Sequence, residues 1–147
     1  MAQLRRLGSD ASFLASVCTG SLLGAAGLIR DQRAACHWAW RDMLLLFGAV
    51  PSDARVEHDG NLLTGGGVTA GIDFGLALVA LLVGQDQAER VQLMLEYAPQ
   101  PPFDRGRPEL ARPEILHVVR ADMEVVMNQR RAIVRAVASG AGFGTAA

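Results

Sequence analysis

Cys18 is the residue of this sequence whose type and position are best suited to chemistry. It follows the short apolar run 13–17 and precedes the small-residue segment 19–27. This pattern predicts a buried strand, a tight turn and a helix that packs closely against a sheet. A cysteine on that turn would lie at the helix N-terminus, where unpaired backbone N–H groups favour a thiolate and stabilise a developing anion. Because a core cysteine is equally compatible with this segment, a nucleophile and a buried thiol both remain open.

A second glycine-rich junction lies at residues 65–67, between the strand candidate 61–64 and the apolar segment 68–83. Two such junctions could line one pocket. The glycines lack the Gly-Lys-Ser/Thr sequence of a phosphate loop and the spacing of a dinucleotide fingerprint. A loop that needs unusual backbone angles is the alternative to a pocket wall. The substrate-pocket residues predicted from the two junctions are Gly20, Gly66, Gly67 and Thr69.

Two nearby residues, His37 and Cys36, could be partners of Cys18. His37 could act as a base, since cysteine and histidine recur together in nucleophilic catalysis, but it is better interpreted as packed with Trp38 and Trp40. Cys36 could form a disulfide with Cys18, although simple packing is the preferred interpretation. The two cysteines and His37 lack the paired spacing of a zinc site, so we expect neither a metal nor an organic cofactor.

Composition narrows the class of protein. The chain has 147 residues, half of them apolar and a fifth charged, which suits one globular domain with a normal core. Its 14 basic residues are scattered arginines and its net charge is −1, so no nucleic-acid partner is expected. Lysine is absent, which excludes a Schiff-base lysine and a Walker phosphate loop. With two cysteines and no signal peptide, the chain is expected to be cytoplasmic and reduced.

Strands alternate with helices along the chain, which predicts a largely parallel α/β sandwich. The Asp59-Gly60 pair predicts a tight turn between two strands, and Gly48 should end a helix that carries Trp40 and Leu44 on one face. The apolar segment 68–83 is too short to cross a membrane and predicts a buried helix. The expected strands are 13–17, 33–37, 55–57 and 61–64, and the expected helices are 1–7, 21–26, 38–47, 68–83, 86–96 and 114–137.

A series of motifs in one order resembles a known family. They are VCTG at residues 17–20, GAAGL at 24–28, RA at 33–34, HWAW at 37–40, DARV at 53–56, DGNL at 59–62, TGGGVTAGID at 64–73 and YAPQPPF at 97–103. Together they resemble the isonitrile hydratase (cyclohexyl isocyanide hydratase) branch of the ThiJ/PfpI superfamily. The resemblance implies a flavodoxin-like, class I glutamine-amidotransferase-like three-layer sandwich, usually a homodimer.

The same resemblance implies a lyase activity, the hydration of an isonitrile to an N-substituted formamide. Its nucleophile would be Cys18, on a nucleophile elbow. Relatives with protease-like or chaperone-like roles often have histidine after the cysteine, whereas the hydratase branch has threonine, as Thr19 is here. Thr19 would donate its backbone N–H to an anion or its hydroxyl to the sulfur. A small isonitrile is therefore the expected partner, with no cofactor.

Two departures from the family pattern lead to further expectations. The resemblance begins within the family's fold, so residues 1–138 are expected to form a partial domain, N-terminally incomplete, followed by a flexible tail at 139–147. The early carboxylate that relatives pair with the cysteine has no match, which predicts a poor or inactive enzyme. Gly24 also follows Cys18 one residue earlier than in the family, which would rotate the helix by about 100°.

Two other functions remain open. The Cys-Thr-Gly and His-Trp motifs also occur in the ligand-sensing domains of AraC-type transcription regulators, but no basic recognition helix follows them here. A redox or carbonyl-stress protein would require Cys18 to oxidise readily to a sulfinate.

Overall fold

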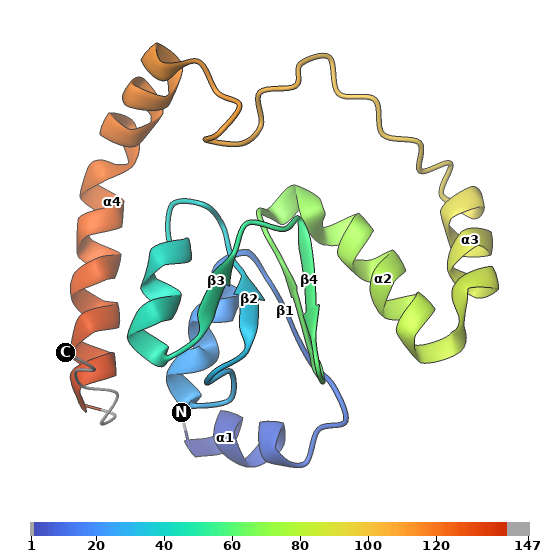
Figure 1. Ribbon diagram of the computed structural model, residues 1–147, viewed down its shortest axis with the longest axis horizontal. Helices are drawn as coiled ribbons and strands as arrows, with labels where there is room; N and C mark the ends of the chain where they lie inside the picture. Colours follow the sequence, from blue (N-terminus) through green and yellow to red (C-terminus); the bar gives the residue numbers. More distant parts are fainter. Residues whose placement is uncertain (1, 141–147) are drawn as a thin grey trace.

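The computed structural model describes residues 2–140, and α-helices, 3-10 helices (η) and strands alternate along it (Figure 1). The elements are α1 (Ala2–Ser9), β1 (Leu14–Val17), η1 (Cys18–Ala26), β2 (Arg33–Ala35), η2 (Arg41–Phe47), β3 (Val50–Ser52), β4 (Val56–Asp59), β5 (Leu62–Gly65), η3 (Val68–Ala70), α2 (Gly71–Val83), α3 (Gln85–Met94) and α4 (Pro113–Gly140). Strands lie in the middle of the molecule, with α2 and α3 on one side and η2 and α4 on the other (Figure 1). This layering confirms the predicted α/β class.

The strands form two small sheets, of which one is mixed in direction and the other parallel. β1 pairs with β5 in parallel, and β5 pairs with β4 in an antiparallel hairpin whose turn residue Gly60 has φ +61°. β2 pairs with β3 in parallel. The hairpin makes the sheet less parallel than the alternation of elements predicts, because a tight Asp-Gly turn can only join antiparallel neighbours.

β3 was not predicted. Its central residue is Pro51, which pairs with Ala34 of β2. Proline lacks a backbone N–H and is tolerated where that position does not need to donate to a neighbouring strand. Among residues 2–140, β3 pairs with β2 alone, so it lies at the edge of its sheet.

The expected helices after Cys18 and around residues 38–47 are present, but both are 3-10 helices. A 3-10 helix turns by about 120° per residue and an α-helix by about 100°. About five residues of this tighter winding therefore recover the rotation that one missing residue removes. Gly24 of η1 packs against the Ile29 side chain with no room for a Cβ atom, which keeps η1 close to its neighbours.

The core lies where η2 meets α4 and the strands. Leu44 and Phe47 are fully buried and Trp40 is nearly so, which confirms the predicted apolar face, and Gly48 ends η2 with φ +73°. α4 docks on this face. Its Val134 and Ala138 are buried, and the Arg130 guanidinium lies 4.7 Å from the centre of a Trp40 ring.

The prediction that residues 68–83 form a buried helix is wrong in one respect. α2 is a helix, but none of its residues is fully buried, and Leu82 and Val83 are 57% and 65% exposed. Only the side that contacts β5, β4 and α3 is covered within the described chain, whereas apolar residues occur all round the helix. Within residues 2–140, no helix combines the length and apolar character needed to cross a membrane.

The remaining helices follow the prediction with shifted boundaries. α3 begins after Gly84, so Asp86 lies in its first turn and does not cap it. Ser139 and Gly140 belong to α4, so they are not part of a tail, and residues 141–147 lie outside the described residues.

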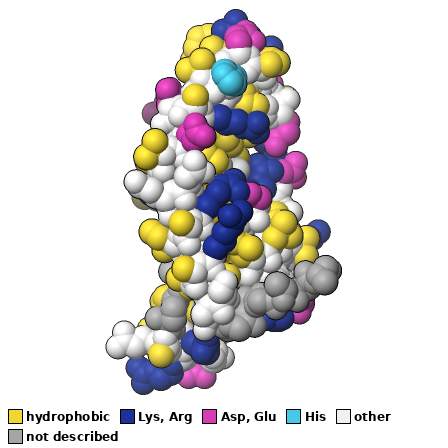
Figure 2. Space-filling view, turned by 90° about the vertical axis from the view of Figure 1, so that its left-hand side faces the viewer, with side chains coloured by type: hydrophobic (Ala, Val, Ile, Leu, Met, Phe, Trp, Pro, Cys, Tyr) yellow, Lys and Arg dark blue, Asp and Glu magenta, His cyan; other side chains and the backbone are white. Residues whose placement is uncertain are grey.

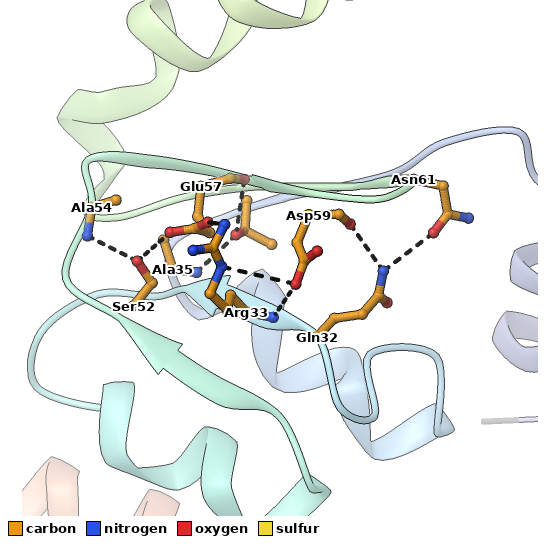
Figure 3. Close-up of polar contacts among 9 residues, drawn as sticks. Gln32, Arg33, Ala35, Ser52, Ala54, Glu57, Asp59 and Asn61 are labelled. Carbon is orange, nitrogen blue, oxygen red and sulfur yellow. Dashed lines mark hydrogen bonds and ion pairs between the residues drawn. The ribbon is translucent and has the colours of Figure 1, made fainter.

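Side chains join β2 to the β4–β5 hairpin (Figure 3). The Arg33 backbone N–H donates to Asp59 Oδ2 at 2.8 Å, and Arg33 Nη2 lies 3.0 Å from Glu57 Oε1. Ser52 of β3 donates to the second oxygen of Glu57 at 2.5 Å. Glu57 therefore links β2 and β3, the two strands of the smaller sheet, to the β4–β5 hairpin. The link is made by side chains, because within residues 2–140 the two sheets share no ladder of backbone hydrogen bonds.

The end of β2 is held by two buried hydroxyl groups. Ala35 N–H donates to Thr64 Oγ1 at 2.8 Å, and Ala35 C=O accepts from Ser21 Oγ at 2.6 Å. Thr64 lies on β5 and Ser21 on η1, and both side chains are buried. These two bonds fix the end of β2 relative to β5 and η1.

Thr64→Val should therefore lower the free energy of unfolding by about 1–3 kcal/mol, because it leaves a buried N–H without an acceptor while preserving side-chain shape. Urea denaturation of both proteins measures this difference. Thr64→Ser keeps the hydroxyl and should lose less than the valine variant. Equal losses in the two variants would contradict the assigned role of the hydrogen bond.

Candidate functional site

Cys18 lies on a sharp turn between β1 and η1. Val17 is extended, with φ −128° and ψ 145°, and Cys18 has φ +62°, in the left-handed region that residues with a Cβ atom seldom adopt. Its side chain is half-buried. A nucleophile elbow has this geometry, since a strained strand-to-helix turn holds the reactive atom above the end of the strand. The turn predicted from the sequence is thus present.

The strain at Cys18 gives a measurable expectation for stability. Cys18→Gly should be more stable than Cys18→Ala by about 1 kcal/mol, because only glycine enters the left-handed region without a steric cost. Thermal or urea unfolding of the two variants gives the difference. A glycine variant less stable than the alanine variant would argue against strain at this position.

The register of the sheet places Cys18 beside the second glycine junction. Val17 pairs with Gly65 at the parallel ends of β1 and β5, so the residues that follow them, Cys18 and Gly66, leave the sheet side by side. In open α/β sheets, ligands bind outside the carboxyl ends of the strands. The two junctions therefore lie at the same end of the sheet.

Cys36 lies at the same edge, directly after β2. It is buried in the core, and burial raises the pKa of its thiol to about 12, with the nearby charge of Cys18 adding to the rise. Cys36 is therefore protonated at neutral pH and unsuited to be a nucleophile. Both cysteines are free thiols, and the place of Cys36 in the core agrees with the packing interpretation.

A cleft of about 280 Å³ opens at this edge. Three of the residues predicted to line a substrate pocket, Gly66, Gly67 and Thr69, line this cleft. Its other lining residues are Cys36, His37, Trp38, Arg41, Asp53, Ala54, Arg55, Val68, Gly106, Arg107 and Pro108.

The backbone angles of the glycine junction and the place of Gly20 differ from what the sequence suggested. None of the glycines at 65–67 has a positive φ, so the alternative that they need unusual backbone angles is wrong. Gly67 instead lies close to His37, whose Cδ2 would be 3.6 Å from a Cβ atom there. Gly20 lines a separate apolar cavity of about 230 Å³ between α1, β1 and η1, because the start of η1 turns it away from the cleft. Cys18 and Thr19 are half-buried and line neither cavity.

His37 is packed between aromatic rings, as expected. Its ring centre is 5.5 Å from that of Trp38 and 5.1 Å from that of Trp40, and its Nδ1 accepts from Ala39 N–H at 3.2 Å. Burial, with a contribution from the charge of Arg130, lowers the His37 pKa. His37 is thus a neutral wall of the cleft at pH 7.

Sequence reasoning missed an ionic network at the mouth of the cleft. Arg55 Nε donates to Asp73 Oδ2 at 2.6 Å, and Arg55 Nη2 donates to the Thr69 carbonyl at 2.6 Å. Tyr97 OH donates to the same Asp73 oxygen at 3.0 Å. The network ties the loop before β4 to η3, α2 and the end of α3. Arg55, Asp73 and Tyr97 all lie within the family motifs described in the sequence analysis. Those motifs were the sequence signal from which the network could have been found.

The segment between α3 and α4 forms part of the cleft wall. Arg107 donates to the Asp53 carbonyl and lies 3.6 Å from the Asp53 carboxylate. Glu109 lies 3.7 Å from Arg41 Nη1. These contacts hold this segment against the loop that follows β3 and against the start of η2.

In the part of the chain that the structure describes, no side chain hydrogen-bonds the Cys18 sulfur, and no group of three histidine, cysteine, aspartate or glutamate residues could hold a metal ion. Cys18 is therefore placed by the backbone turn and by the neighbouring strand ends.

Comparisons with known proteins agree with this architecture. The chain is 54% identical over 118 residues to the isonitrile hydratase of Pseudomonas putida, a match that covers 80% of this chain and 52% of that protein. A crystal structure of a ThiJ/PfpI family protein from Pseudomonas syringae superimposes with a TM-score of 0.85 and 43% identity, over 93% of this chain and 55% of that one. The chain thus spans about half the length of these relatives.

More distant structures share the fold. Oxidized DJ-1 of Toxoplasma gondii superimposes with a TM-score of 0.59 at 23% identity, over 67% of this chain and 53% of that one. These neighbours confirm the flavodoxin-like α/β fold expected from the sequence. The model of the DJ-1/PfpI family matches residues 1–81, which include β1, the Cys18 turn, the glycine junction and most of α2. This protein therefore belongs to the DJ-1/PfpI family.

Proposed function

We propose that this protein uses Cys18 as a nucleophile to hydrate an isonitrile to an N-substituted formamide. The observation that carries the proposal is the left-handed turn at Cys18, which holds the thiol at the end of β1 beside the glycine junction. The isonitrile hydratase of Pseudomonas putida, 54% identical over the matched region, supports this reaction class. Under this proposal the protein is a cysteine-dependent lyase.

The proposed reaction has two stages. First, the Cys18 sulfur bonds to the terminal carbon of the isonitrile, and a proton reaches that same carbon, so that the triple bond becomes a C=N double bond in a thioimidate. Water then adds to this carbon while the nitrogen takes a proton. The C–S bond breaks, the thiol regains its proton, and the N-substituted formamide leaves. One water is consumed and no electrons are exchanged.

Thr19 and the glycine junction have assigned roles in this proposal. Thr19 follows the nucleophile at the start of η1, where its backbone N–H or its hydroxyl would stabilise charge near the sulfur. Gly66, Gly67 and Thr69 would form the wall against which the substrate lies. Because no carboxylate in residues 2–140 bonds the Cys18 sulfur, protons would come from water and turnover should be slow.

Incubation with cyclohexyl isocyanide tests the proposal. Intact-mass spectrometry should detect a Cys18 adduct heavier by one isonitrile, and NMR should detect the N-cyclohexylformamide formed by its hydrolysis. Peptide mapping assigns the adduct to one of the two cysteines. The absence of both an adduct and formamide above the rate without protein would refute the proposed chemistry.

A further inference from the structure

Three arginines, Arg41, Arg55 and Arg107, line the cleft together with the single carboxylate of Asp53. Two of the arginines are already engaged. Arg55 donates to Asp73 and to a backbone carbonyl, and Arg107 contacts Asp53 and Glu109. Both guanidinium groups thus already have acceptors within the protein. The remaining cation of the cleft wall is Arg41.

Arg41 has unused hydrogen-bonding capacity. Its side chain is only 21% exposed, and its Nε is buried without a hydrogen-bond partner. The carboxylate of Glu109 lies 3.7 Å from Nη1, which exceeds hydrogen-bond distance. The adjacent carboxylate of Asp42 is occupied by Arg131, at 2.7 and 3.3 Å. A guanidinium in this state favours an incoming anion, because it has five donors and cannot lose its charge.

Arg41 lies on the wall of the same cleft as the Cys36 thiol. It lines the same cleft as Cys36 and the glycine junction, and its positive charge acts on the Cys36 thiol. Cys36 in turn lies near Cys18. On the face that α4 presents, basic side chains gather near the middle with acidic ones beside them (Figure 2). A small molecule in the cleft would thus have a cation along its wall, and Cys18 would lie outside that wall at the neighbouring end of β1.

Resting on the proposed function, we infer that the substrate of this cleft is an isonitrile that carries a carboxylate. Arg41 binds the carboxylate oxygens, since a planar guanidinium pairs with a carboxylate through two parallel hydrogen bonds. Cys18 does not line the cleft, so the isocyano carbon has to reach beyond the cleft wall to meet the sulfur at the end of β1. Glu109 competes for the same guanidinium, so it lowers the affinity for the anion.

Binding of reaction products tests the inference without any turnover. We expect N-formylglycine, which carries a carboxylate, to bind more tightly than neutral N-ethylformamide when each is titrated by calorimetry or NMR. Arg41→Gln should weaken N-formylglycine binding about tenfold or more and leave N-ethylformamide unaffected. Glu109→Gln should strengthen N-formylglycine binding several-fold, because it removes the competing carboxylate.

The two variants control for each other. Both break the Arg41–Glu109 contact, so a merely structural effect on residues 106–109 would change affinity in the same direction. Opposite changes support the inference. Arg112→Gln, which removes an exposed arginine paired with Glu114, should bind N-formylglycine like the unaltered protein.

Equal affinity of the unaltered protein and Arg41→Gln for N-formylglycine would overturn the inference, as would tighter binding of the neutral amide. Circular dichroism of each variant establishes that it is folded. Failure of the proposed function has a different signature, since cyclohexyl isocyanide carries no carboxylate and reports on Cys18 chemistry alone. Suppose that the protein forms an adduct with cyclohexyl isocyanide but shows no preference for the anionic product. The proposed reaction would then stand, and only the inference that the substrate carries a carboxylate would be overturned.

Discussion

Replacing Cys18 with serine is expected to abolish both the isonitrile adduct and the formamide product, a loss of at least about 10³-fold. Serine is close to cysteine in size and would meet the same φ +62° backbone, so the fold should be retained. Its hydroxyl is a weak nucleophile without an adjacent base, whereas a thiol reacts through its readily formed thiolate. The rate of formamide formation and the intact mass after incubation measure this effect.

Alkylation with iodoacetamide separates Cys18 from the other thiol. The unaltered protein should take up one label under native conditions, because Cys36 is buried and its raised pKa keeps it protonated. Cys18→Ser should take up none, and Cys36→Ala should still take up one. Full hydration activity in Cys18→Ser would rule out the assigned nucleophile.

The second large effect concerns the core. Leu44→Ala should lower the free energy of unfolding by about 2–5 kcal/mol, because Leu44 is fully buried between η2 and its neighbours and its loss leaves a cavity. This cost is a large part of the stability of a typical domain. Urea denaturation at constant temperature measures it.

Leu45→Ala is the matched control, since Leu45 is the next residue of η2 and is 64% exposed. The same chemical change there should alter stability by less than about 0.5 kcal/mol. Similar losses at the two positions would mean that η2 does not present the Leu44 face to the core, and the docking of α4 on η2 would then need revision.

Much of the local structure could be predicted from the sequence. The Asp59-Gly60 turn, the glycine that ends η2 and the face carrying Trp40 and Leu44 all follow from interactions within a few residues. The turn at Cys18 was predicted for the same reason, since an apolar run followed by small residues defines a strand, a turn and a helix. The activity, the homodimer and the domain boundary remain predictions.

Apart from β3, the sequence by itself determined the order of strands and helices and the presence of a cysteine on a turn, because these depend on neighbours along the chain. Only the tertiary structure decided which side chains share the cleft. It directed Gly20 into another cavity and brought Arg41 and Arg55 to the wall. It also joined Ala35 to Thr64, 29 residues away. Such contacts arise from packing between elements distant in sequence, and no local pattern encodes their partners.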